Sequence, residues 1–116
     1  MSTTQEVLDH HLGCFGAGDL DGIMEDYADD CVLFTPNGPL NDLDAIRELF
    51  VGMIAEFGQP GTEFEMKLVS VVGEYAYILW SAETASNIYE IGTDTFIIRD
   101  DKIVGQSLAA KVTAKN

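Results

Sequence analysis

The chain has 116 residues, enough for one domain with a hydrophobic core, and 47% of its residues are hydrophobic. Twenty acidic residues against six basic ones give a formal net charge of −14, which argues against binding to nucleic acids or to anionic membrane surfaces. The first residues lack the basic and apolar regions of a signal peptide, and no apolar run is long enough to span a bilayer. We therefore expect residues 1–116 to form a single cytoplasmic domain.

The first part of the chain predicts two helices. Thr3 and Glu6 have the spacing of a capping box, and apolar residues then recur at helical intervals until the Gly16-Ala17-Gly18 stretch. Asp19 is a suitable N-cap for a short second helix, whose apolar face should extend to Tyr27.

A short strand at about residues 31–35 should follow. The stretch from Thr35 to Pro39 cannot continue a strand ladder, because prolines lack the backbone donor. A third helix should begin at Asn41 or Asp42, either of which can act as its N-cap, and should stop at Gly58.

From residue 62 the hydrophobic pattern changes to alternation, which is typical of strands. The expected strands lie at residues 63–72, 75–86, 88–99 and 102–113. Helices followed by a run of strands predict an α+β fold, in which the helices pack on one face of an antiparallel sheet.

Several stretches together resemble a known family; in chain order they are FGAGDLDGIMEDYADDCVLF, AIRELF and DTFIIRDDKIV. Their order and spacing are similar to those of ketosteroid isomerases and SnoaL-like proteins, in the nuclear-transport-factor-two-like superfamily. The resemblance covers nearly the whole chain. It implies a cone-shaped, cystatin-like fold, in which a strongly curved antiparallel sheet wraps the helices and leaves an apolar pocket at its open end.

The resemblance also implies positions for catalytic groups. Ketosteroid isomerases use an aspartate base, and a tyrosine and a protonated aspartic acid that donate hydrogen bonds to the developing enolate oxygen. By local similarity these positions fall on Thr35, His11 and Asp94, respectively, while Tyr27 matches an aromatic position that supports the tyrosine. Thr35 cannot act as a base near neutral pH, so we do not expect the standard ketosteroid isomerase reaction.

Periodicity alone gives a consistent placement of two of these residues. His11 lies four residues from both Val7 and Phe15 and so shares the buried stripe of the first helix. Asp94 alternates with Phe96 and therefore shares an apolar face of its strand. Two interpretations stay open: His11 is a hydrogen-bonded core histidine, or His11 and Asp94 form a pair in the pocket.

The family frame places further side chains in the pocket. Glu83 would be the best substitute for the missing base; the alternative is a solvated glutamate near a strand end. The residues expected to line the pocket, besides His11, Asp94 and Glu83, are Tyr27, Thr35, Phe50, Tyr77, Leu79, Ser81, Phe96, Gln106 and Leu108.

The opposite face of the sheet should be apolar and should pack against a second copy of the chain, unless the chain's own tail covers it. The residues expected on this face are Trp80, Ala82, Tyr89, Ile91, Ile97 and Ala109.

Three classes of function stay open: an enzyme, a non-catalytic binder of a small apolar ligand, and an interaction module. The enzyme would be an acid–base catalyst of isomerase or cyclase type that acts on an apolar carbonyl compound, with His11 as proton carrier or donor and Asp94 as its partner or as a donor to the oxyanion. Glu83 or a bound water would act as the base. We expect no metal ion or organic cofactor, and we expect Cys14 and Cys31 to be free buried thiols.

Overall fold

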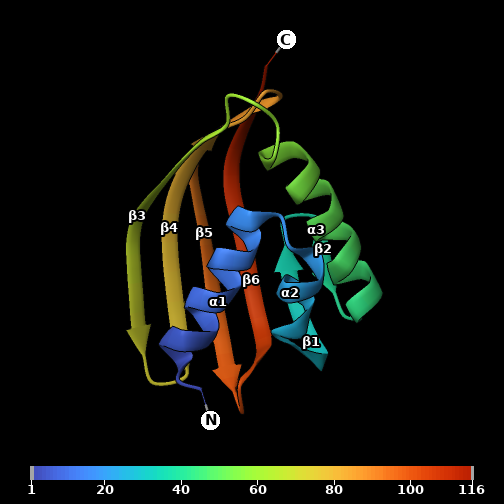
Figure 1. The fold of residues 1–116 in the computed structure, drawn as a ribbon, viewed down its shortest axis with the longest axis vertical. Helices are drawn as coiled ribbons and strands as arrows, with labels where there is room; N and C mark the ends of the chain where they lie inside the picture. The colour runs from blue at the N-terminus through green and yellow to red at the C-terminus, as the bar shows by residue number, and fades with distance from the viewer. Residues whose placement is uncertain (1, 116) are drawn as a thin grey trace.

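The computed structural model describes residues 2–115, in which a curved six-stranded sheet partly encloses a layer of helices (Figure 1). The helices are α1 (Thr4–Ala17), α2 (Leu20–Glu25) and α3 (Leu43–Phe57). The strands are β1 (Tyr27–Thr35), β2 (Gly38–Leu40), β3 (Glu63–Val72), β4 (Tyr75–Glu83), β5 (Asn87–Arg99) and β6 (Lys102–Ala114). No helix within residues 2–115 is both long and apolar enough to cross a membrane.

The strands follow the order β2-β1-β6-β5-β4-β3 across the sheet. Strands β3 to β6 pair antiparallel with their neighbours in sequence, but β1 runs parallel to β6. The α+β class is therefore confirmed, whereas the sheet is mixed and not purely antiparallel. The sheet is mixed because β1, which follows α1 and α2 in the chain, pairs in parallel with β6, the last strand.

Local signals define the helix ends as expected. The side chains of Thr3 and Glu6 form the reciprocal capping box of α1, and Gly18 ends this helix with a left-handed backbone (φ 70°). Asp19 caps α2 through the Gly22 amide, and Asp42 caps α3.

Two expectations between the helices were wrong. Tyr27 is the first residue of β1 and not part of the second helix. The chain also continues the sheet after the turn, since Gly38–Leu40 folds back as β2 and pairs with β1. Pro39 is tolerated there because β2 is an edge strand, where a missing backbone donor leaves no ladder partner unsatisfied.

Strand β4 faces the opposite way from the family-based expectation. Ile78 and Trp80 are buried under the helices, with exposed fractions of 4% and 3%, so the odd-numbered residues of β4 lie on the outer face. A one-residue difference in register reverses every side chain of a strand. The residues that the prediction wrongly turned inward are Tyr77, Leu79, Ser81 and Glu83. Conversely, Trp80 and Ala82 belong to the core and not to an outer dimer face.

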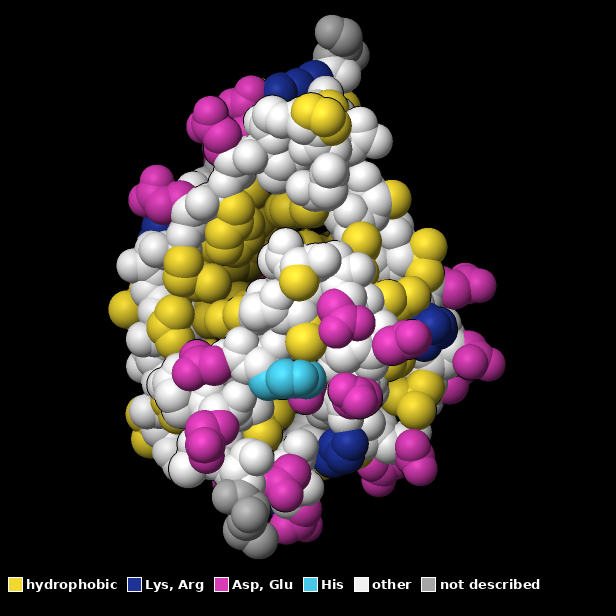
Figure 2. Space-filling model, in the orientation of Figure 1, with side chains coloured by type: hydrophobic (Ala, Val, Ile, Leu, Met, Phe, Trp, Pro, Cys, Tyr) yellow, Lys and Arg dark blue, Asp and Glu magenta, His cyan; other side chains and the backbone are white. Residues whose placement is uncertain are grey.

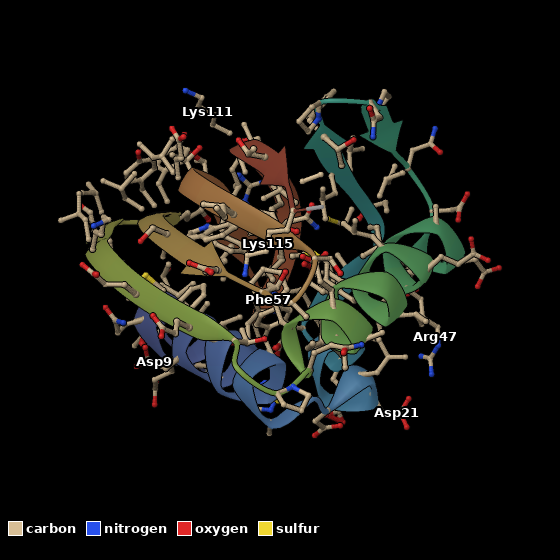
Figure 3. The ribbon with its side chains drawn as sticks, turned by 90° about the horizontal axis from the view of Figure 1, so that it is seen from above. Asp9, Asp21, Arg47, Phe57, Lys111 and Lys115 are labelled. Carbon is tan, nitrogen blue, oxygen red and sulfur yellow. The ribbon has the colours of Figure 1, made fainter. Side chains whose placement is uncertain are left out.

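The end of α3 is fastened to the sheet by hydrogen bonds. Viewed from above, Phe57 lies between α3, α1 and the sheet (Figure 3). The preceding residue, Glu56, accepts hydrogen bonds from the side chains of Thr84, Asn87 and Tyr89, at 2.7 to 2.9 Å. These bonds hold the end of α3 over the sheet, beside the cavity described next.

Candidate active site

An apolar cavity of about 50 Å³ lies between α1, α3 and the inner face of strands β3 to β6. Most of its walls are aromatic and aliphatic side chains. Its titratable side chains are His11 from α1 and Asp94 from β5, and Gln106 from β6 adds an amide. A cavity with a few polar groups in apolar walls is the usual form of a small-molecule site.

A larger hollow of about 360 Å³ adjoins this cavity at the ends of α1 and α3. The two spaces share the side chains of Leu12, Phe15, Phe57 and Phe64. Figure 2 shows a hollow on this side of the molecule with hydrophobic side chains on its walls. Ligand sites commonly measure roughly 300–1,000 Å³, a range that includes the outer hollow but not the cavity.

Asp94 is 7% exposed and sits in a hydrogen-bonded network. Its carboxylate accepts bonds from Trp80 Nε1 and from Gln106 Nε2, each at 2.9 Å, and the Tyr27 hydroxyl donates to Gln106 Oε1 at 2.6 Å. Burial raises the pKa of Asp94 to about 6, and the two hydrogen bonds act in the opposite direction. Near neutral pH the carboxyl group is therefore mostly ionised but close to its midpoint.

His11 lines the cavity from α1 and is surrounded by aromatic side chains. Its ring makes edge contacts with Tyr27, Phe50 and Phe96, at centroid distances of 5.5 to 5.7 Å. Burial lowers the pKa of His11 to about 4, and the nearby charge of His10 contributes to this shift. The imidazole is therefore neutral near neutral pH. Its Nδ1 is buried and has no hydrogen-bond partner among residues 2–115.

His11 and Asp94 share the cavity, as expected, but they do not form a pair. No hydrogen bond or ion pair joins them within the described part of the chain, and both carboxylate oxygens of Asp94 are occupied by Trp80 and Gln106. The nearest carboxylate to His11 Nδ1 is that of Asp26, at 3.8 Å. Of the two interpretations left open, the direct pair is therefore wrong, although both residues are buried; the other, a hydrogen-bonded core histidine, fails at Nδ1, which has no partner among residues 2–115.

Asp26, at the end of α2, is a site residue that the sequence reasoning missed. Both of its oxygens lie 2.9 Å from Nδ1 of His10, which is half-exposed. Burial raises the pKa of Asp26, while the hydrogen bond from His10 lowers it; the same bond raises the pKa of His10. The spacing of these residues gives no signal, because their contact depends on how α1 and α2 cross.

Cys14 lies beside His10 but lacks the geometry of an activated nucleophile. Its sulfur is 3.5 Å from Nε2 and 4.0 Å from Nδ1 of the His10 ring. Such similar distances place the sulfur beside the ring. Proton transfer would require the sulfur to lie along the direction of the Nε2 lone pair instead. Burial and the neighbouring Asp19 raise the pKa of the thiol. Both cysteines are free as expected, but only Cys31 is fully buried.

The remaining predicted residues divide into two groups. Phe50, Phe96, Gln106 and Leu108 line the cavity, and Tyr27 supports it through Gln106. Thr35 does not line it.

The hydroxyl of Thr35 donates to the Gly38 carbonyl at 2.8 Å and accepts a bond from the Asn37 amide at 3.1 Å. The Thr35 hydroxyl therefore stabilises the turn between β1 and β2. The Thr35 side chain borders a different hollow, on the surface.

Glu83 lies outside the cavity, so it cannot replace the missing base. Its carboxylate is about half-exposed and pairs with Lys115 at 2.6 Å. Together with Ser81 it borders a separate surface hollow. No group of three side chains within residues 2–115 has the arrangement of a metal site.

Residues 8–106 match the sequence model of the SnoaL-like domain family. Similar solved structures include an NTF2-like protein of unknown function from Mesorhizobium loti, with a TM-score of 0.75, 22% identity and coverage of 93% of this chain and 90% of that one. A candidate polyketide cyclase from Sinorhizobium meliloti has a TM-score of 0.72 and 17% identity, over 89% of this chain and 93% of that one. A candidate ketosteroid isomerase from Kribbella flavida has a TM-score of 0.76 and 9% identity, over 97% of this chain and 81% of that one.

At these identities the structural similarity establishes the fold alone. No curated protein sequence matches the chain. Because the family model covers most of the sequence, from residue 8 to residue 106, the chain belongs to the SnoaL-like domain family.

Proposed function

We propose that this chain is an acid–base enzyme of isomerase or cyclase type that acts on a small apolar compound with a carbonyl group. The observation that carries the proposal is the carboxyl group of Asp94, which is buried in an apolar cavity and has a pKa of about 6. A group with a pKa near the working pH can both take and return a proton. The candidate polyketide cyclase and ketosteroid isomerase with the same fold support this class of reaction.

In the proposed reaction, the Asp94 carboxylate takes a proton from the carbon next to the carbonyl. The electron pair of the broken C–H bond forms a carbon–carbon double bond, the π pair of the carbonyl group moves to its oxygen, and an enolate forms. Gln106 lines the cavity and uses one N–H group on Asp94, so its other N–H group is available to that oxygen. Asp94 then returns the proton to another carbon; alternatively, the enolate carbon attacks a second carbonyl in a ring closure, and Asp94 returns the proton to the alkoxide oxygen that this attack produces.

Neighbouring side chains prepare Asp94 for this role. Trp80 and Gln106 fix the direction of the carboxylate, and Tyr27 fixes the amide of Gln106. The apolar walls limit the access of water, which strengthens electrostatic interactions in the cavity. The base would therefore act from β5, and the hydroxyl of Thr35, which is held in a turn, would have no part in the reaction.

Non-catalytic binding of the same class of ligand is the second candidate. It is favoured by the hydrogen-bonded network around Asp94, in which Trp80 and Gln106 already occupy both carboxylate oxygens. In such a site the carboxylate would orient a ligand without exchanging its protons.

Hydrogen–deuterium exchange at carbon separates the two candidates without knowledge of the natural substrate. Small cyclic and aryl ketones would be incubated with the protein in deuterated water, and the loss of the signals of protons next to the carbonyl would be followed by NMR. We expect exchange with the wild type and a loss of about 100-fold or more in Asp94→Asn, which cannot accept the proton. Glu83→Gln, which removes a carboxylate outside the cavity, should exchange at the wild-type rate.

Exchange that survives in Asp94→Asn would contradict the assignment of the base. Ketones that bind without any exchange would favour the second candidate.

A further inference from the structure

The buried ring of His11 lies between two different environments. Its Nδ1 is 3.8 Å from Oδ2 of Asp26, which is not part of the cavity wall, whereas the ring itself lines the cavity. The two nitrogens of an imidazole point in widely different directions, so Nε2 is the nitrogen on the cavity side. Within residues 2–115 the Nδ1 atom has no hydrogen-bond partner that would otherwise determine its protonation.

The carboxyl group of Asp26 is the polar group that bears on which nitrogen of His11 carries the proton, because it lies 3.8 Å from Nδ1. A neutral imidazole has one N–H group and one lone pair. A lone pair on Nδ1 would face the negative charge of Asp26, whereas an N–H group is attracted to it. His10 fixes the position of Asp26, because its Nδ1 lies 2.9 Å from both carboxylate oxygens. Burial raises the pKa of Asp26, and the hydrogen bond and charge of His10 act in the opposite direction and favour the carboxylate form. The other charged groups near Asp26 are Glu25 and Lys102, whose effects on it oppose each other.

We infer that Asp26 holds His11 as the Nδ1–H tautomer, and that Nε2 therefore faces the cavity as an acceptor for a hydroxyl, enol or phenol group of the ligand. This inference rests on the proposed function only in taking the cavity as the ligand site. Together with the carbonyl group assigned above, it points to hydroxy-ketones and enolised dicarbonyl compounds. His11 would bind the O–H group of such a ligand while Asp94 exchanges a proton with carbon.

The requirement for an O–H group follows from burial. A ligand that fills the cavity excludes water from Nε2, and a buried acceptor without a donor is costly. A hydroxyl group satisfies this nitrogen, whereas a methyl ether of the same shape cannot. Asp26 is thus a positioning residue, and His10 in turn positions Asp26.

The tautomer can be observed directly by NMR of nitrogen-15-labelled protein near neutral pH. The chain has two histidines, so the signals that vanish in His10→Gln identify His10 and those that remain identify His11. We expect Nδ1 of His11 to be protonated and Nε2 to be unprotonated in the wild type. Asp26→Asn should increase the Nε2–H form, while Glu25→Gln, which removes a neighbouring charge that does not face His11, should not.

An Nε2–H form in the wild type would overturn the inference, and so would an unchanged tautomer in a folded Asp26→Asn chain. The wild-type measurement decides the question even if Asp26→Asn does not fold.

Ligand preference gives a second, independent readout. Phenol and anisole differ in the O–H group, and their binding can be followed through the His11 signals. We expect phenol to bind the wild type at least about tenfold more tightly than anisole, because only phenol satisfies Nε2. The preference should be retained in Glu25→Gln and should decrease in Asp26→Asn.

Equal binding of the two compounds, or no binding of either, would overturn the inference about the ligand. Neither readout needs turnover. A phenol preference without any carbon exchange would therefore refute the proposed catalysis and leave this inference intact, whereas exchange without the preference would refute this inference alone.

Discussion

Burial acts in opposite directions on the two titrating side chains of the cavity. It lowers the pKa of His11 from 6.5 to about 4 and raises that of Asp94 from 3.8 to about 6. As the pH falls from 6.5 towards 4, the unfolded chain binds more protons at His11, so His11 lowers the free energy of unfolding. As the pH falls from 6 towards 3.8, the folded chain binds more protons at Asp94 than the unfolded chain does, so Asp94 raises the free energy of unfolding. The two effects largely cancel in the wild type.

Replacing either residue should reveal the effect of the other. Relative to the wild type, the free energy of unfolding of Asp94→Asn should fall by on the order of 3 kcal/mol as the pH is lowered from about 6 to about 4. That of His11→Gln should rise by a similar amount over the same range. Urea unfolding at constant salt, followed through Trp80, measures both. Variant curves parallel to the wild type would show that burial does not shift these groups.

At the scale of elements, the pairing of β4 with β5 positions the indole that holds Asp94. Gly92 lies opposite Trp80 in the register, and a Cβ atom at Gly92 would overlap the indole ring. Gly92→Ala should therefore displace Trp80, destabilise the fold by about 1–3 kcal/mol and raise the pKa of Asp94, which loses a donor. Tryptophan fluorescence and a carbon-13 titration of the carboxyl group measure these changes.

The helices offer a matched control for this substitution. Gly13 and Gly52 lie in α1 and α3, and a Cβ atom at either position meets nothing within 4 Å. Alanine there should stabilise the protein by about 0.5–1 kcal/mol, because glycine weakens a helix interior. If Gly92→Ala behaved like these two variants, the close packing of Trp80 against β5 would not matter for the site.

The elements also show what the sequence could and could not predict. Helix ends depend on neighbouring residues, so the caps at Thr3 and Asp19 and the stop at Gly18 could be located. The direction of β4 could not, because apolar residues occupy both faces from Tyr77 to Trp80 and the alternation does not say which face meets the helices. The contact between α1 and α2 that supports His11 is a tertiary feature without a local signal.

At the scale of the whole molecule, the outer face of the curved sheet is apolar. Ile91, Ile97 and Ala109 lie on it as expected, whereas Tyr89, like Trp80 and Ala82, lies on the inner face. Tyr75 and Val72 are 60% and 71% exposed and lie opposite each other in the register; Leu68 is 48% exposed and lies opposite Leu79. An exposed apolar surface on a sheet favours association with another copy. We therefore still expect a homodimer through the sheet face, now centred on these outward residues of β3 and β4.

Sedimentation equilibrium over a range of concentrations tests this expectation. The wild type should be dimeric, and Leu68→Glu should be monomeric because it places a charge in the contact. Val51→Glu is the matched control: Val51 is 51% exposed but lies on α3, away from the sheet, so this variant should remain dimeric. The net charge of −14 per chain opposes association, so added salt should strengthen the wild-type dimer by screening this repulsion. A wild type that stays monomeric in high salt would contradict the dimer, and equal effects of the two variants would place the contact elsewhere.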